Sequence, residues 1–125
     1  MKVSTIFTIN AVVAVLFGLA FIFAPVWLLS FYGITADATT AFIGQLLGAA
    51  FVGFAIISWM ARNAPASPAR SAILLSFFIG DAIGFIVSLL AQMKGVANAL
   101  GWSTVAIYLL LALAFGYLQF MGKDS

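Results

Sequence analysis

The residue best suited to chemistry in this chain is Asp81, a carboxylate within a long run of apolar residues. It is the only acid between Asp37 and Asp124, and it lies eleven residues beyond Arg70. At the rise of an α-helix that separation is about 16 Å, roughly half the thickness of the hydrocarbon core of a membrane. An ionised carboxylate at that depth costs several kcal/mol. We therefore expect Asp81 to be protonated and hydrogen-bonded, or to face polar groups inside the protein.

The chemistry open to Asp81 depends on its polar neighbours. The candidate partners, all within apolar stretches, are Asn10, Gln45, Ser88 and Tyr108. Asn10 and Gln45 each belong to a line of small residues, which favours positions inside a helix bundle. Two interpretations stay open. Asp81 is either a proton relay or substrate-binding carboxylate, or a protonated side chain that bonds its helix to neighbouring helices.

The composition excludes most other site chemistry. The chain has no cysteine and no histidine, so it lacks thiol nucleophiles, disulfides, the usual zinc and haem ligand, and the commonest general base. We expect no catalytic, cofactor-binding or metal-ligating residues, and no enzyme activity. The five Lys and Arg residues form no cluster along the sequence, which argues against a nucleic-acid partner.

The elements that position Asp81 follow from the charge intervals. Charged residues make up 6% and hydrophobic residues 66% of the 125 residues, whereas a soluble domain carries about 25% charged residues. A water-soluble monomer is therefore excluded. Runs of about 20 apolar residues can span a membrane, and we predict one all-α transmembrane domain. Its spans are residues 4–24, which we treat as retained, 38–61, 69–93 and 98–121, with an interfacial segment at 26–33.

The short connections predict sequential antiparallel packing, that is, an up-down-up-down four-helix bundle. The positive-inside rule predicts its orientation. Four cations fall at the termini and in the second loop, and Lys94 alone falls at the opposite end. We therefore expect both termini on the cytoplasmic side.

Small residues at helical spacing mark the faces where membrane helices approach closely. The positions expected to pack helices are Gly18, Gly44, Gly48, Gly53, Ser76, Gly80, Gly84 and Gly116. The spacing does not distinguish contacts inside one bundle from contacts between subunits, so a homo-oligomer or a larger membrane complex stays open alongside contact with membrane lipid.

Three stretches carry a resemblance that covers nearly the whole chain: FGLAFIFAPVWLLSFYG (17–33), GQLLGAAFVGFAIISWMARN (44–63) and GDAIGFIVSLLAQMKGVANALGW (80–102). They resemble uncharacterised small bacterial membrane proteins with four transmembrane helices, which are similar in size and topology to DoxX-like proteins. The resemblance implies a multi-pass protein of the bacterial inner membrane. It supplies no activity and no catalytic residue.

Three functions are compatible with these observations. The first is a non-enzymatic membrane protein that acts by association, as an accessory or assembly subunit or as a homo-oligomer. The second is a proton-coupled transporter of a small hydrophobic or cationic solute that uses Asp81. The third is binding of a lipid, quinone or carotenoid between the helices. A cavity that reaches Asp81 would favour a solute, and a dry, packed Asp81 would favour association.

Overall fold

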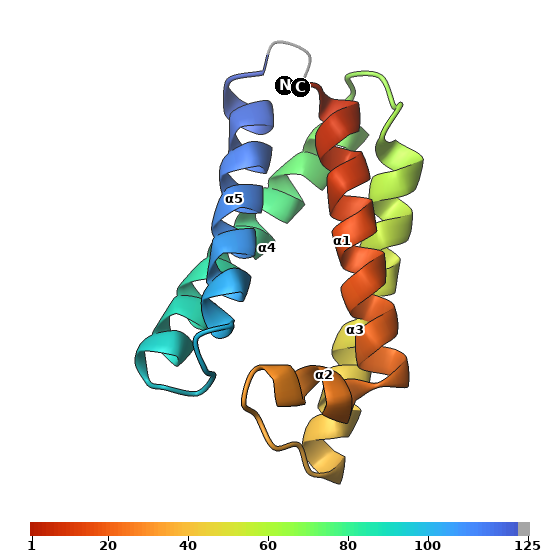
Figure 1. Cartoon of the computed structure of the whole chain (residues 1–125). Coiled ribbons are helices and arrows are strands. Elements are labelled where there is room, and N and C mark those ends of the chain that lie inside the picture. Colours follow the sequence, from red (N-terminus) through yellow and green to blue (C-terminus); the bar gives the residue numbers. More distant parts are fainter. Residues whose placement is uncertain (123–125) are drawn as a thin grey trace.

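The structure, a computed structural model, describes residues 1–122, and this range contains helices and no strand. The helices are α1 (Val3–Phe23), α2 (Pro25–Phe31), α3 (Ala38–Ala61), α4 (Pro68–Met93) and α5 (Gly101–Phe120) (Figure 1). All except the short α2 are long and apolar enough to cross a membrane. The four predicted apolar helices are therefore confirmed. Lys123 and Asp124 lie outside the described residues.

Proline and glycine divide the first half of the chain. Pro25 has no backbone N–H and opens α2 directly after α1 ends. Gly33 closes α2 with a positive φ of 73°, a conformation that glycine adopts without strain. The segment expected at 26–33 is therefore a short helix followed by a glycine turn.

Polar side chains cap the next two helices. Asp37 Oδ1 accepts a hydrogen bond of 2.8 Å from the Thr40 backbone N–H at the start of α3, and this bond lowers the pKa of Asp37 below its ordinary value. Ser67 Oγ accepts from the Arg70 backbone N–H, and Pro68 occupies the first turn of α4. Asp37 and Ser67, which interrupt the apolar pattern, therefore act as caps at the helix N-termini.

The last helix begins later than the expected Asn98. In the structure α5 starts at Gly101, because Asn98 belongs to a turn in which its Oδ1 accepts from the Leu100 backbone N–H. Asn98 also reaches across to the first half of the chain. Its backbone N–H donates to the Tyr32 carbonyl at 2.8 Å, and its Nδ2 donates to the Phe31 carbonyl at 2.9 Å.

The long helices pair as two hairpins. α1 packs along α3, and α4 packs along α5, whereas contacts between the pairs are few (Figure 1). Close approach in the first hairpin depends on glycine: a Cβ at Gly48 would lie 2.6 Å from the Gly18 carbonyl oxygen. The hairpins meet in one hydrophobic cluster near the start of α1, formed by Ile6, Phe7, Ala61, Leu74, Phe115 and Leu118.

Substitution of Gly48 tests this glycine contact. We expect Gly48→Ala to destabilise the protein by about 1–3 kcal/mol, because the new Cβ would meet the α1 backbone, which cannot move aside cheaply. The matched control is Gly53→Ala, also in α3, where a Cβ would meet nothing within 4 Å. Alanine there should leave stability unchanged or raise it by up to about 1 kcal/mol. Thermal unfolding in detergent measures both, and equal effects would contradict the close contact.

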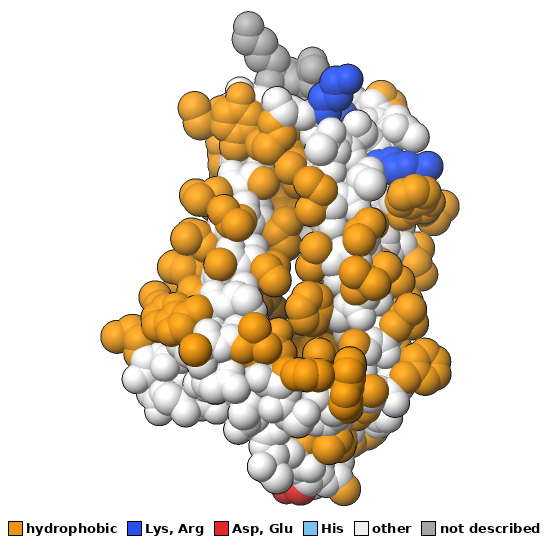
Figure 2. Space-filling model, in the orientation of Figure 1, with side chains coloured by type: hydrophobic (Ala, Val, Ile, Leu, Met, Phe, Trp, Pro, Cys, Tyr) orange, Lys and Arg blue, Asp and Glu red, His pale blue; other side chains and the backbone are white. Residues whose placement is uncertain are grey.

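The exterior of the long helices is apolar. Large hydrophobic side chains are exposed on every one of them, such as Leu16, Met60, Val87 and Leu110. Figure 2 shows hydrophobic side chains spread over one face of the molecule. A soluble monomer rarely exposes apolar surface so continuously. The same surface is what a lipid environment requires.

Candidate functional site

A cavity of about 620 Å³ lies between the two hairpins. Residues of all five helices line it, and most of them are hydrophobic, with phenylalanines such as Phe17, Phe51 and Phe77 among them. Figure 2 shows the molecular surface hollowed between the hairpins, with hydrophobic side chains on both sides. The volume and the mostly apolar lining fall in the range of sites that bind small molecules.

The cavity is bounded toward both ends of the helices. At one end Phe77 and Leu111 line the cavity and also pack on the hydrophobic cluster around Phe7. At the other end Tyr32 and Ile34 line it, beside the turn in which Asn98 bonds to the Tyr32 carbonyl. The hairpins are therefore joined at two levels, and the cavity occupies the stretch between them.

Asp81 lies on α4 and lines this cavity. Its Oδ2 atom is buried, and no residue in the range 1–122 supplies a hydrogen-bond partner for it. A buried polar atom without a partner costs about 1–3 kcal/mol, and more if it is charged. Asp81 therefore lines the cavity, while its buried Oδ2 has no hydrogen bond to a neighbouring helix within residues 1–122.

Tyr108 is a predicted partner that packs against α4 at Gly84, three residues from Asp81. It lines the same cavity from α5, and its ring packs directly on Gly84 of α4, so a Cβ there would overlap the ring carbons. Gly84 lies three residues after Asp81, which places the two on one face of the helix. Glycine thus lets the aromatic ring approach α4 beside the carboxylate.

Asn10 lines the same cavity as Asp81 but has another hydrogen-bond partner. It is 6% exposed and lines the cavity, but its Nδ2 donates to Ser58 Oγ at 2.8 Å. Ser58 is fully buried and was not among the predicted partners. Asn10 lies near the start of α1 and Ser58 near the end of α3, so similar depth in antiparallel helices is the signal that could have indicated the pair. Their bond joins α1 to α3.

Gln45 is not brought together with Asp81. It is exposed and does not line the cavity, and its Nε2 donates to the Ile22 carbonyl at 3.2 Å. That carbonyl is near the end of α1, where the helix stops before Pro25 and leaves acceptors without partners. Ser88 does line the cavity, but its hydroxyl donates to the Phe85 carbonyl of its own helix.

The small residues expected to pack helices fall in two groups. Five of them have a close neighbour on another helix or connecting segment at the Cβ position: Gly18, Gly44, Gly48, Gly84 and Gly116. Gly53 and Gly80 have nothing within 4 Å of that position, and Ser76 is exposed. Gly80 and Ser76 line the cavity instead. The α4 line of small residues therefore borders open space over part of its length.

The class that this fold defines is a small helical protein whose four long helices are apolar enough for a multi-pass arrangement in a membrane. Within that class the chain belongs to a family described as a domain of unknown function (DUF8292), which matches residues 1–120. Comparisons with curated proteins and with solved structures find no match. The family agrees with the expected likeness to uncharacterised proteins, and the looser likeness to DoxX-like proteins stays a prediction.

Proposed function

We propose that the protein binds a small hydrophobic molecule with a cationic or hydrogen-bond-donating group in the cavity between its hairpins. The observation that carries this proposal is the buried, unpartnered Oδ2 of Asp81 in an otherwise mainly apolar cavity, judged over residues 1–122. An apolar body would satisfy the phenylalanine lining, and a donor group would satisfy the carboxylate. An Asp81 packed against other helices would have supported action by association alone.

Binding has more structural support than transport across the membrane. The hydrophobic cluster bounds the cavity at one end, and the Asn98 turn lies beside its other end. The interfaces between the hairpins, with few contacts along their length, are the natural route for a hydrophobic molecule from surrounding lipid. Transport would require a rearrangement of one hairpin against the other.

The setting of this site is part of the proposal. We place the chain as an up-down-up-down bundle in a bacterial inner membrane, in contact with lipid. Lys2, Arg62 and Arg70 line one pocket, so the start of α1, the end of α3 and the start of α4 lie together. The positive-inside rule assigns this end to the cytoplasm. The exposed apolar faces leave room for a homo-oligomer or a larger complex.

A matched pair of ligands tests the proposal. We expect 4-phenylbutylamine to bind the protein in lipid nanodiscs about tenfold more tightly than 4-phenylbutanol, because only the amine offers a charged donor to Asp81. Isothermal titration calorimetry measures both affinities, with empty nanodiscs as the control for partition into lipid. Binding no greater than in empty nanodiscs would contradict the cavity as a ligand site. Equal, saturable binding of both molecules would contradict the role of Asp81.

A further inference from the structure

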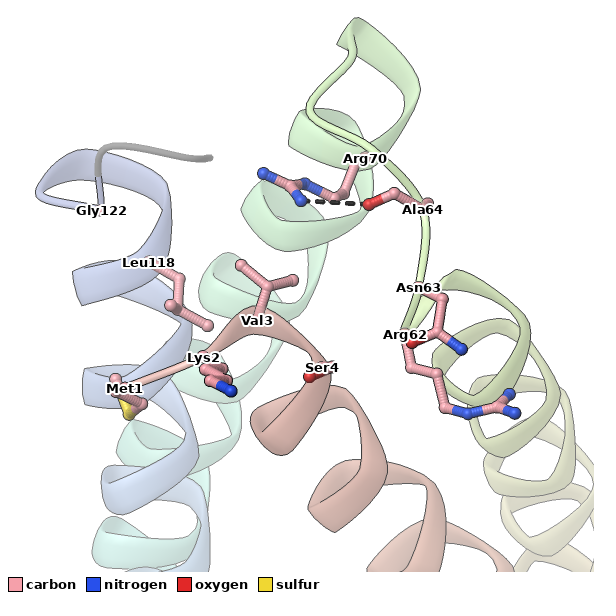
Figure 3. A pocket seen from close by; sticks show the side chains of 10 residues that line it. All are labelled: Met1, Lys2, Val3, Ser4, Arg62, Asn63, Ala64, Arg70, Leu118 and Gly122. Atoms are coloured by element: carbon pink, nitrogen blue, oxygen red, sulfur yellow. Dashed lines mark hydrogen bonds between the residues drawn. The ribbon is translucent and has the colours of Figure 1, made fainter.

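A second pocket, of about 340 Å³, lies at the end where α1 begins, on the far side of the Phe7 cluster from the cavity. Its lining includes Lys2, Arg62, Asn63 and Arg70, with Leu118 on α5 completing one wall (Figure 3). We call it the cationic pocket. Because the hydrophobic cluster separates it from Asp81, its function is independent of the solute binding proposed above.

Arg70 is the unusual member of the cationic pocket. It is only 6% exposed, although arginines near the ends of membrane helices ordinarily extend toward water. Its Nη1 donates to the Ala64 carbonyl at 3.1 Å (Figure 3). Its Nε and Nη2 are buried and have no hydrogen-bond partner within residues 1–122. These two atoms form one edge of the guanidinium, which is the edge that pairs with two oxygens of a phosphate or carboxylate.

No described acid balances this charge. The two acids within residues 1–122 are Asp37, which caps the start of α3 at the other end, and Asp81, which lies in the cavity. Arg70 also sits in the first turn of α4, where the helix dipole disfavours a cation and favours an anion. Arg62 adds a second guanidinium at the pocket. Its Cζ lies 3.7 Å from the centroid of the Trp59 ring.

We propose that the cationic pocket binds a phosphate group, carried either by an anionic phospholipid or by a soluble phosphate compound. The Nε and Nη2 edge of Arg70 pairs with two phosphate oxygens. Lys2 adds charge from the segment before α1, and the N-terminus of α4 adds its positive potential. The location at the end of the spans is the level at which lipid phosphates lie.

Arginine side-chain NMR gives a direct test, because the chain contains only two arginines, Arg62 and Arg70. The full chain with ¹⁵N-labelled arginine is placed in nanodiscs of phosphatidylcholine, with or without phosphatidylglycerol. We expect the Arg70 Nε–H signal to shift saturably with phosphatidylglycerol or on titration of inorganic phosphate. A response to the lipid alone identifies a headgroup site, and a response to inorganic phosphate identifies a site for soluble phosphates. No response to either overturns the proposal.

Charge variants distinguish a specific site from general attraction. Lys2→Gln should weaken the interaction about fivefold, as expected for loss of one cation near the membrane surface. Lys94→Gln removes a cation at the opposite end of α4 and should change it less than twofold. Equal effects of the two variants would overturn the proposal. So would an Arg70 signal that moves with Asp124→Asn and not with either phosphate, because the chain's own carboxylate would then be the partner.

Discussion

Asp81→Asn is expected to weaken binding of 4-phenylbutylamine by about tenfold or more and to leave the affinity for 4-phenylbutanol within about twofold. Asparagine has nearly the shape of aspartate, and its amide oxygen can accept a hydrogen bond, but it carries no charge and cannot form an ion pair with an ammonium group. Asp81 lines the cavity, and its Oδ2 has no hydrogen-bond partner among residues 1–122. The substitution therefore removes a contact with the ligand without breaking a hydrogen bond of Oδ2 within the protein. Calorimetry of both ligands in nanodiscs measures the effect.

Stability separates this expectation from a structural role of Asp81. A carboxyl group that bonded α4 to another helix would leave a less stable protein when replaced. We expect unfolding of the Asp81→Asn protein in detergent to occur at the same or a higher temperature, because a neutral side chain is cheaper to bury in a membrane span. A lower unfolding temperature together with equal loss of both ligands would contradict the proposed role.

Ser88→Ala is the matched control for that experiment. Ser88 lies on the same helix and lines the same cavity, but its hydroxyl donates to the Phe85 carbonyl and is already satisfied. Its removal should change the affinity for the amine less than about twofold. A loss comparable to that of Asp81→Asn would indicate that any polar change in the lining disturbs binding.

Much of the fold follows from rules that act along the sequence. Charge intervals and span length locate the four apolar helices, and Pro25 and Gly33 mark the boundaries of the short one. Asp81 also emerges from the sequence alone, because a carboxylate deep in an apolar run has no ordinary explanation. These features depend on local composition, which a single sequence contains in full.

The side chains that form the site depend on which helix faces meet, and the sequence alone predicts these contacts less well. Spacing of four residues places Ser76, Gly80 and Gly84 on one face of α4 but does not say what covers it. Gly84 meets Tyr108, whereas Gly80 borders the cavity. Likewise the line of small residues around Gln45 predicts a position inside the bundle, yet Gln45 is exposed and bonds to the end of α1.

Arg70 shows the same limit for a charged residue. In the sequence it is an ordinary marker of membrane orientation at the start of a span. Its burial depends on how the ends of α1, α3 and α5 close around it, because residues near each of these ends line the cationic pocket. The sequence shows where Arg70 lies along the chain. Only the packing reveals that two nitrogen atoms of its guanidinium lack hydrogen-bond partners among residues 1–122.

Gly80→Leu is expected to abolish binding of both test ligands, with at least about a tenfold loss, and to leave the protein folded. Gly80 lines the cavity, and a Cβ there would meet nothing within 4 Å, so a leucine side chain can extend into the space that the ligand would occupy. Leucine also favours a helix more than glycine does, by up to about 1 kcal/mol. The substitution therefore places a bulky side chain in part of the cavity without opposing the fold.

Gly53→Leu makes this result specific to the cavity. Gly53 is also a helical glycine with nothing within 4 Å of its Cβ position, but it does not line the cavity. The same change of side chain there should leave both affinities within about twofold. If both leucine variants bind the amine as the unsubstituted protein does, the ligand lies elsewhere. If both lose it, the effect arises from added bulk on the helices. If only Gly80→Leu loses binding, and loses the amine and the alcohol equally, the effect comes from the apolar volume of the site. It is then distinct from the effect of the Asp81 charge, which acts on the amine alone.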